Sequence, residues 1–286
     1  KVQPYKADTL TKDFTAGDTI TVKATPTPTG KAPDNSAMFA ASFTAPGAGQ
    51  MAVFVNGVQV SEPADAGADG VYTMTVRAAD VLLAANGPGT GITLTAKFVE
   101  NNNMADGQGT ATVSISAAAK AERGGALLGY YDESGLVAAL ANSGNEGAVF
   151  TLLDNMERET DLKINISCTL DLNGKTIHST GEYASALGIS SGATATIRGA
   201  GTVLSEHSHG LSVGGTATLE GGTFISGAAN CSGAYVQAGK LIVTGENVVM
   251  RNTGNGNGLS VNSGTGATAQ LSAGTYGGGT AAIEIY

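Results

Sequence analysis

Residues 210–227 read GLSVGGTATLEGGTFISG, a run made mostly of glycine, threonine, serine and small apolar residues. The apolar side chains come in short bursts, first Leu211 and Val213, then Leu219 and Phe224. Bursts of this kind, separated by glycine, predict three very short strands joined by tight turns. Because strands this short are not stable alone, the pattern indicates that similar strands stack on them.

The same pattern recurs along the C-terminal half of the chain. One of its strands reads ALGI, GLSV, GAYV, GLSV and AIEI, starting at residues 186, 210, 233, 258 and 282, so the starts lie 24, 23, 25 and 24 residues apart. A further step back of 24 residues reaches Leu162, which opens LKINISCTLDLNGKTI. Helical repeats and leucine-rich repeats have other signatures. The period therefore predicts a right-handed parallel β-helix of about five coils, each about 24 residues long.

Three of these segments carry a resemblance to known proteins. They are LDLNGKTI (residues 170–177), ATATIRGAGTV (193–203) and ATLEGGTFISG (217–227). They resemble coils of the pectate-lyase-like β-helix superfamily and, more closely, the β-helical regions of large surface proteins of gut Gram-positive bacteria. The resemblance covers about residues 130–286. It implies the fold and an extracellular, cell-surface location, but no single activity, because the superfamily includes lyases, hydrolases, tailspikes and adhesins.

The two ends of the solenoid differ in sequence. The segment DESGLVAALANSG (132–144) predicts a short amphipathic capping helix, with Asp132 or Ser134 as N-cap and Gly144 just beyond its end, followed by a strand AVFTLL (148–153). At the other end the sequence stops inside a coil that has only begun, and it carries neither an initiator Met nor a signal peptide. We therefore expect residues 132–286 to be a capped but C-terminally truncated solenoid, with its anchor outside this fragment.

Residues 1–118 lack the repeat and predict a separate all-β domain. The turn Asn56-Gly57 is a strong hairpin signal, and AADVLLAA (78–85) predicts one or two helical turns. The expected strands are TITVKA (19–24), MFAASF (38–43), MAVFV (51–55), VQV (58–60), VYTMTV (71–76), ITLTAKFV (92–99) and TATVSI (110–115). Seven short strands favour an immunoglobulin-like β-sandwich, which resembles the Ig-like modules of bacterial surface proteins. Residues 119–131 change in composition and are expected to form a linker.

Bulk composition limits the partners and the chemistry. The net charge is −9, and both halves of the chain are acidic, so nucleic acid and anionic membranes are unsuitable partners and no membrane insertion is expected. The two cysteines, Cys168 and Cys231, fall at different coil positions and are expected to be free thiols. No phosphate-binding motif is present, and no cofactor is expected.

Candidate catalytic and metal-binding groups are sparse. Glu182 and Glu206 occupy the same position in successive coils, so ungapped stacking places them about one strand spacing apart, where they could form an acid–base pair. The alternative is two solvated turn residues. His207 and His209 share a face if extended, but no third metal ligand is evident. The segment ENNNMADG (100–107) is rich in oxygen ligands for Ca²⁺, although a plain hairpin loop explains it.

The most variable part of each coil is the segment just before each repeat start. These segments span residues 180–185, 205–209, 228–232, 252–257 and 276–280, and stacking places them along one polar edge. The candidate ligand-binding residues on this edge are Glu182, Tyr183, Glu206, His207, His209, Asn230, Asn255 and Asn257. The leading hypothesis is a non-enzymatic adhesin that binds a host protein, immunoglobulin being one candidate, or a host glycan. The alternatives are a carbohydrate-active enzyme and a passive stalk.

Overall fold

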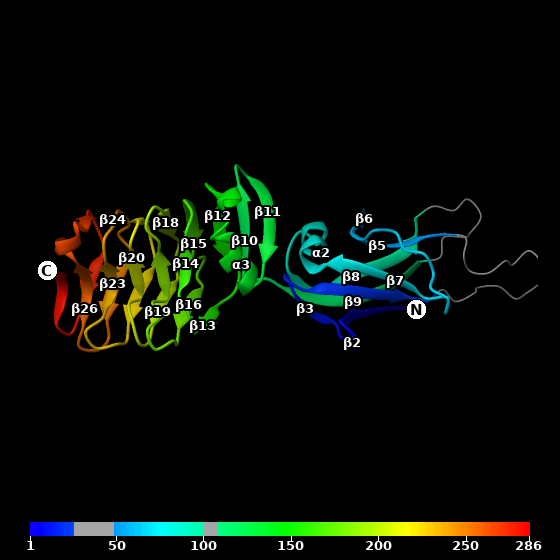
Figure 1. The fold of residues 1–286 in the computed structure, drawn as a ribbon, viewed down its shortest axis with the longest axis horizontal. Coiled ribbons are helices and arrows are strands. Elements are labelled where there is room, and N and C mark those ends of the chain that lie inside the picture. Colours follow the sequence, from blue (N-terminus) through cyan, green and yellow to red (C-terminus); the bar gives the residue numbers. More distant parts are fainter. Residues whose placement is uncertain (26–48, 100–107) are drawn as a thin grey trace, which may run out of the picture. The chain divides into compact units, whose positions relative to one another are not determined.

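The computed structural model describes residues 1–25, 49–99 and 108–286, which form an all-β chain of two compact units, Lys1–Ala117 and Ala118–Tyr286. The C-terminal unit is a parallel β-helix of about five turns (Figure 1). The predicted strand at 38–43 and the loop at 100–107 lie outside the described residues.

The N-terminal unit contains two sheets, with strand orders β2-β1-β4-β7 and β3-β9-β8-β5-β6. Six predicted strands and the predicted helix α2 (Ala78–Ala85) are confirmed. Asn56 and Gly57 adopt φ values of 49° and 82°, which confirms the hairpin turn. The strands are β1 (Val2–Lys6), β2 (Thr9–Leu10), β3 (Asp13–Thr15), β4 (Thr19–Ala24), β5 (Met51–Val55), β6 (Val58–Gln59), β7 (Tyr72–Arg77), β8 (Gly89–Phe98) and β9 (Gln108–Ser116). The immunoglobulin-like topology stays a prediction.

The solenoid is built from three sheets of parallel strands, which we name C, D and E in the order in which each coil visits them. Sheet C contains β12 (Val149–Leu152), β15 (Cys168–Asp171), β18 (Thr194–Arg198), β21 (Thr216–Leu219), β24 (Lys240–Val243) and β27 (Thr268–Leu271). Sheet D contains β13 (Met156–Arg158), β16 (Thr176–Ser179), β19 (Thr202–Ser205), β22 (Thr223–Ser226), β25 (Val249–Asn252) and β28 (Thr275–Gly277). Sheet E contains β14 (Leu162–Ile164), β17 (Leu187–Ile189), β20 (Leu211–Val213), β23 (Ser232–Val236), β26 (Asn257–Val261) and β29 (Ala281–Ile285).

The repeat read from the sequence coincides with the register of sheet E. Leu187 pairs with Leu211, and the ladder continues through Ala234 and Leu259. All four side chains are fully buried, because alternate residues of each short strand point into the solenoid. The step back of 24 residues is wrong by one position, since Leu162 pairs with Leu187 and not with Ala186.

A short helix closes the first coil. Helix α3 (Glu133–Ala139) is N-capped by Asp132, whose carboxylate accepts a hydrogen bond of 2.8 Å from the Gly135 amide. Leu136 and Leu140 are fully buried in the solenoid core. The helix ends at Ala139, and the predicted C-terminal residue Gly144 lies instead in a separate 3₁₀ turn, η1 (Ser143–Asn145). The predicted capping helix is thus present but shorter than expected.

Residues 119–131 do not form a linker. They form strands β10 (Ala119–Arg123) and β11 (Ala126–Tyr131), an antiparallel hairpin that pairs with β12 and extends sheet C. Gly124 and Gly125 form the turn with positive φ values of 60° and 82°. Small buried side chains at Ala119 and Ala121 give this segment the alternation of a strand, which its mixed composition obscures.

Candidate functional site

The predicted polar edge corresponds to the turns that join each strand of sheet D to the following strand of sheet E. We call this surface the D–E edge; its turns are residues 159–161, 180–186, 206–210, 227–231, 253–256 and 278–280. Successive turns follow one another along the solenoid. The amide of Glu206 donates to the carbonyl of Ser179 at 3.0 Å, and the amide of Gly227 donates to the carbonyl of Ser205 at 2.8 Å.

Glu182 and Glu206 are not at equivalent positions. Leu187 pairs with Leu211 in sheet E, whereas Ser179 pairs with Ser205 in sheet D. The turn at 180–186 is therefore two residues longer than the turn at 206–210, and the backbone of Glu206 follows Ser205 as Thr180 follows Ser179. The expectation that the two carboxylates stack in register is wrong, because it assumed turns of equal length.

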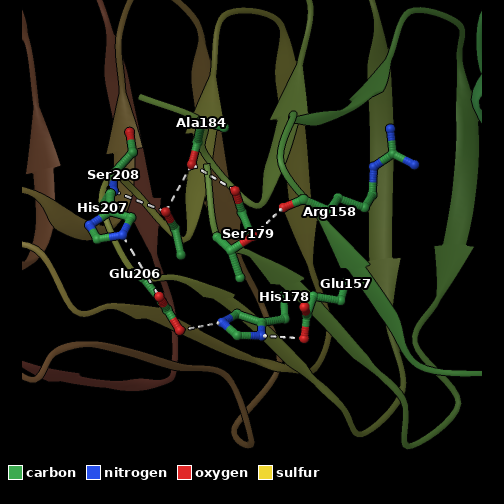
Figure 2. A network of polar contacts seen from close by, with 10 residues as sticks. Glu157, Arg158, His178, Ser179, Ala184, Glu206, His207 and Ser208 are labelled. Atoms are coloured by element: carbon green, nitrogen blue, oxygen red, sulfur yellow. Dashed lines mark hydrogen bonds and ion pairs between the residues drawn. The ribbon is translucent and has the colours of Figure 1, made fainter. Parts of the chain in front are cut away.

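Glu206 instead takes part in a network with two histidines (Figure 2). Its carboxylate lies 3.0 Å from Nε2 of His178 and 3.7 Å from Nε2 of His207. The other ring nitrogen of His178, Nδ1, lies 3.7 Å from the carboxylate of Glu157. His178 therefore sits between two carboxylates on the outer side of sheet D. His178 was not among the predicted site residues, because it lies within strand β16 and not in a D–E turn.

Buried serine side chains hold the D–E turns from inside. Ser179, Ser205 and Ser226 are in register, and each is at most 1% exposed. The hydroxyls of Ser179 and Ser205 both donate to the carbonyl of Ala184, at 3.1 and 2.8 Å (Figure 2). Since buried carbonyls must find donors, these bonds fix the course of the long turn at 180–186.

The long turn borders a hollow of about 580 Å³ on the D–E edge. Tyr183 projects from it with 86% of its surface exposed, and the tyrosine hydroxyl donates to Glu182 Oε1 at 3.2 Å. The hollow is lined by Glu159, Thr160, Asp161, Lys163, Glu182, Tyr183 and Ala184. Two predicted residues, Glu182 and Tyr183, thus face one concavity, together with residues of the preceding D–E turn that the sequence did not single out.

His209 lies in a different environment from His207. Its ring stacks on Tyr235, and its Nδ1 accepts a hydrogen bond of 2.9 Å from the Ser232 amide. Burial lowers the pKa of His209 to about 4, so the ring is neutral at pH 7. Within residues 1–25, 49–99 and 108–286, no three His, Cys, Asp or Glu side chains are grouped so that they could hold a metal ion.

The three predicted asparagines divide into two kinds. Two of them, Asn230 and Asn255, are exposed on the D–E edge. Asn230 adopts a left-handed φ of 60°, and its backbone N–H donates to the backbone carbonyl of Asn255 at 3.2 Å. Asn257 is only 7% exposed, and its Nδ2 donates to Ser260 Oγ at 3.0 Å and to Glu284 at 2.6 Å. Its place on the exposed edge is therefore a wrong prediction, because Asn257 is the first residue of β26.

Asn252 has a structural role that the sequence did not reveal. It continues the buried ladder of Ser179, Ser205 and Ser226 and is 8% exposed. Its Nδ2 donates to the carbonyls of Ala228 and Cys231, and its Oδ1 accepts from the amides of Gly254 and Gly256. One side chain therefore stabilises two successive turns of the edge.

Three further features of the described chain concern its cysteines, a second hollow and its helices. Cys168 and Cys231 are free, which confirms the prediction of two thiols. The N-terminal unit has its own hollow, of about 740 Å³, next to the exposed apolar side chains of Val58 and Leu83. None of the helices in the described ranges is both long and apolar enough to span a bilayer.

Comparisons with known proteins do not supply a function. The chain matches no family model, no curated protein and no solved structure.

Proposed function

We propose that this chain is a non-enzymatic binding module of a bacterial surface protein, in which a right-handed solenoid follows an immunoglobulin-like domain. Its ligand is a host protein, with immunoglobulin as one candidate, or a host glycan. The location and the host partner follow from the resemblance of the coils to bacterial surface proteins. The observation that carries the binding function is the position of Tyr183, which is 86% exposed beside a hollow of about 580 Å³.

The D–E edge has the properties of a recognition surface. Its turns differ in length and sequence, whereas the strands around them repeat, so variation is concentrated where a rigid scaffold presents side chains to solvent. Buried hydrogen bonds from Ser179 and Ser205 to Ala184 hold the longest turn in place. A preorganised surface loses less conformational entropy when a ligand binds.

The separation of Glu182 from Glu206 supports binding rather than glycoside hydrolysis by this pair. A hydrolase needs two carboxyl groups facing each other across the scissile bond. Glu206 is engaged with His178 and His207, while Glu182 accepts from Tyr183 in a turn that is two residues longer. Glu182 and Glu206, the acid–base pair predicted from the sequence, therefore lie in two different local environments.

The test is a capture experiment with the full chain. We would immobilise it, pass human serum and intestinal mucosal secretion over it, and identify retained proteins by mass spectrometry, with a glycan array in parallel. Three forms would be compared: the unchanged chain, Tyr183→Ser, and Lys240→Ser, which changes an exposed side chain of sheet C. We expect a ligand that Tyr183→Ser loses and Lys240→Ser retains. Equal retention by both variants would show that Tyr183 does not contact the ligand and would remove the observation that carries the proposal. An empty column with a silent array would favour a passive stalk.

A further inference from the structure

The hollow beside Tyr183 carries more negative than positive charge. Glu159, Asp161 and Glu182 line it together with a single cation, Lys163. Lys163 Nζ lies 4.0 Å from Asp161 Oδ2, so it is associated with that carboxylate. In the described part of the chain, neither Glu159 nor Glu182 lies in an ion pair. The lining therefore carries three carboxylates and one lysine, and this net negative charge is complementary to a positively charged ligand group.

The aromatic ring adds a second, independent recognition element. Tyr183 is the most exposed large hydrophobic side chain in the described ranges, so its ring is available to a ligand. The hydroxyl bond of 3.2 Å to Glu182 ties the ring to one of the carboxylates. An aromatic face attracts a cation through its quadrupole, and a planar guanidinium can stack on it while donating to a neighbouring carboxylate. The volume, about 580 Å³, leaves room for a long side chain of a partner protein.

The backbone that presents these groups is closely packed. A Cβ at Gly181 would overlap the carbonyl oxygen of Glu159, so the long turn can lie against the preceding one only because residue 181 is glycine. Thr180 donates its amide to the carbonyl of Arg158 at 2.9 Å, and Ala184 donates to Gly181 at 3.2 Å. The two walls of the hollow, residues 159–163 and 182–184, are thereby held together by the solenoid itself.

We infer that this hollow receives one cationic side chain, an arginine guanidinium, from a protein partner. The guanidinium stacks on the Tyr183 ring and donates hydrogen bonds to Glu182 and Glu159. This inference rests on the proposed binding function and specifies the chemistry of its ligand. It selects a protein with an exposed arginine over a neutral glycan.

The test uses the isotope-labelled full chain and backbone NMR. The probe is N-acetyl-L-arginine methylamide, and its matched control is N-acetyl-L-citrulline methylamide, which has nearly the same shape but no charge. We expect saturable shifts of the amides of residues 159–163 and 182–184 with the arginine probe, and affinity weaker by roughly threefold to tenfold with citrulline. Added salt should weaken the arginine interaction further.

Variants separate the two recognition elements from a general charge effect. Glu182→Gln and Tyr183→Leu should each weaken the arginine interaction, whereas Glu220→Gln, which removes an exposed carboxylate from another corner of the solenoid, should leave it unchanged. Equal shifts with citrulline, shifts elsewhere in the chain, or no saturation would overturn the inference. So would saturable binding of a neutral methyl glycoside at these residues, but that result would leave the proposed binding function standing. If the unchanged chain captured no ligand and responded to none of the probes, both the arginine inference and the proposed binding function would be overturned.

Discussion

The imidazole of His209 lies on the ring of Tyr235, with centroids 4.6 Å apart and an angle of 26° between the planes. The Ser232 amide donates to Nδ1 of the same imidazole at 2.9 Å, so Nδ1 carries no proton. Burial lowers the pKa of His209 from 6.5 to about 4. His209 was predicted to be a ligand-binding residue of the polar edge, but its ring is part of the packing between two coils.

This arrangement predicts a loss of stability in mild acid. Above pH 6.5 the His209 ring is neutral in both the folded and the unfolded chain. As the pH falls from about 6.5 to about 4, the unfolded chain takes up a proton that the folded chain does not, so the free energy of unfolding decreases. The loss attributable to His209 approaches about 2 to 3 kcal/mol at the lower limit. Urea titrations between pH 4 and 7.5 measure it.

The control for this prediction is His209→Asn. An asparagine Oδ1 can accept from the Ser232 amide in place of Nδ1, but it does not titrate in this range. The variant loses the contact with Tyr235 and should be less stable than the unchanged chain at pH 7.5. The difference between the two chains should shrink towards pH 4. A constant difference across the range would show that His209 is not held neutral by the fold.

Asn252 provides a test of the internal ladder. Replacing Asn252 by Ala removes a buried side chain that accepts from the amides of Gly254 and Gly256 and donates to the carbonyls of Ala228 and Cys231, in two turns of the D–E edge. Unpaired buried polar groups are costly, so we expect a loss of about 2 to 4 kcal/mol in the free energy of unfolding and faster amide exchange at Gly254 and Gly256.

Asn255→Ala is the matched control, because this side chain belongs to the same turn and is exposed. Its effect should stay within about 0.5 kcal/mol. Similar losses from the two substitutions would mean that Asn252 contributes through turn propensity rather than through its buried hydrogen bonds.

The solenoid is readable from the sequence because its core repeats. Core positions such as Leu187, Leu211 and Leu259 must be apolar and in register. Their spacing in the sequence therefore gives the length of each coil directly. The hairpin at 119–131 was missed because the buried positions of its first strand, β10, are alanines, which are common in linkers too. The strand β1 was missed because Pro4 interrupts a short and mostly polar stretch.

The candidate site is less readable because it lies in turns of unequal length. A constant period aligned Glu182 with Glu206, although the two extra residues of the turn at 180–186 separate them. The same reasoning placed Asn257 on the edge, where a strand has already begun. Burial of His209 by Tyr235 depends on packing between coils, which no local pattern in the sequence encodes.

Gly181 links the fold to the proposed binding hollow. In Gly181→Ala the new Cβ would overlap backbone atoms of Glu159, which cannot move as a flexible side chain can. We expect a loss of about 1 to 3 kcal/mol and a displacement of residues 182–184. In Gly277→Ala the Cβ meets no atom within 4 Å, so this substitution in β28 is the control and should be close to neutral. Thermal unfolding and the capture assay report the two effects; a stable Gly181→Ala variant with full binding would contradict the packing argument.

The reactivity of the Cys168 thiol reports whether the first coils stay closed. Its side chain is buried, and burial raises the pKa of the thiol to about 12. Because the thiolate is the nucleophile, Cys168 should react with a disulfide reagent at pH 8 at least about a thousandfold more slowly in the folded chain than in urea. The Cys231→Ser variant isolates this signal, since Cys231 is the other free thiol of the described chain and is less buried. Rapid labelling of Cys168 without denaturant would mean that β15 opens locally, and the ladder from Cys168 to Ala195 would then not be a permanent part of the core.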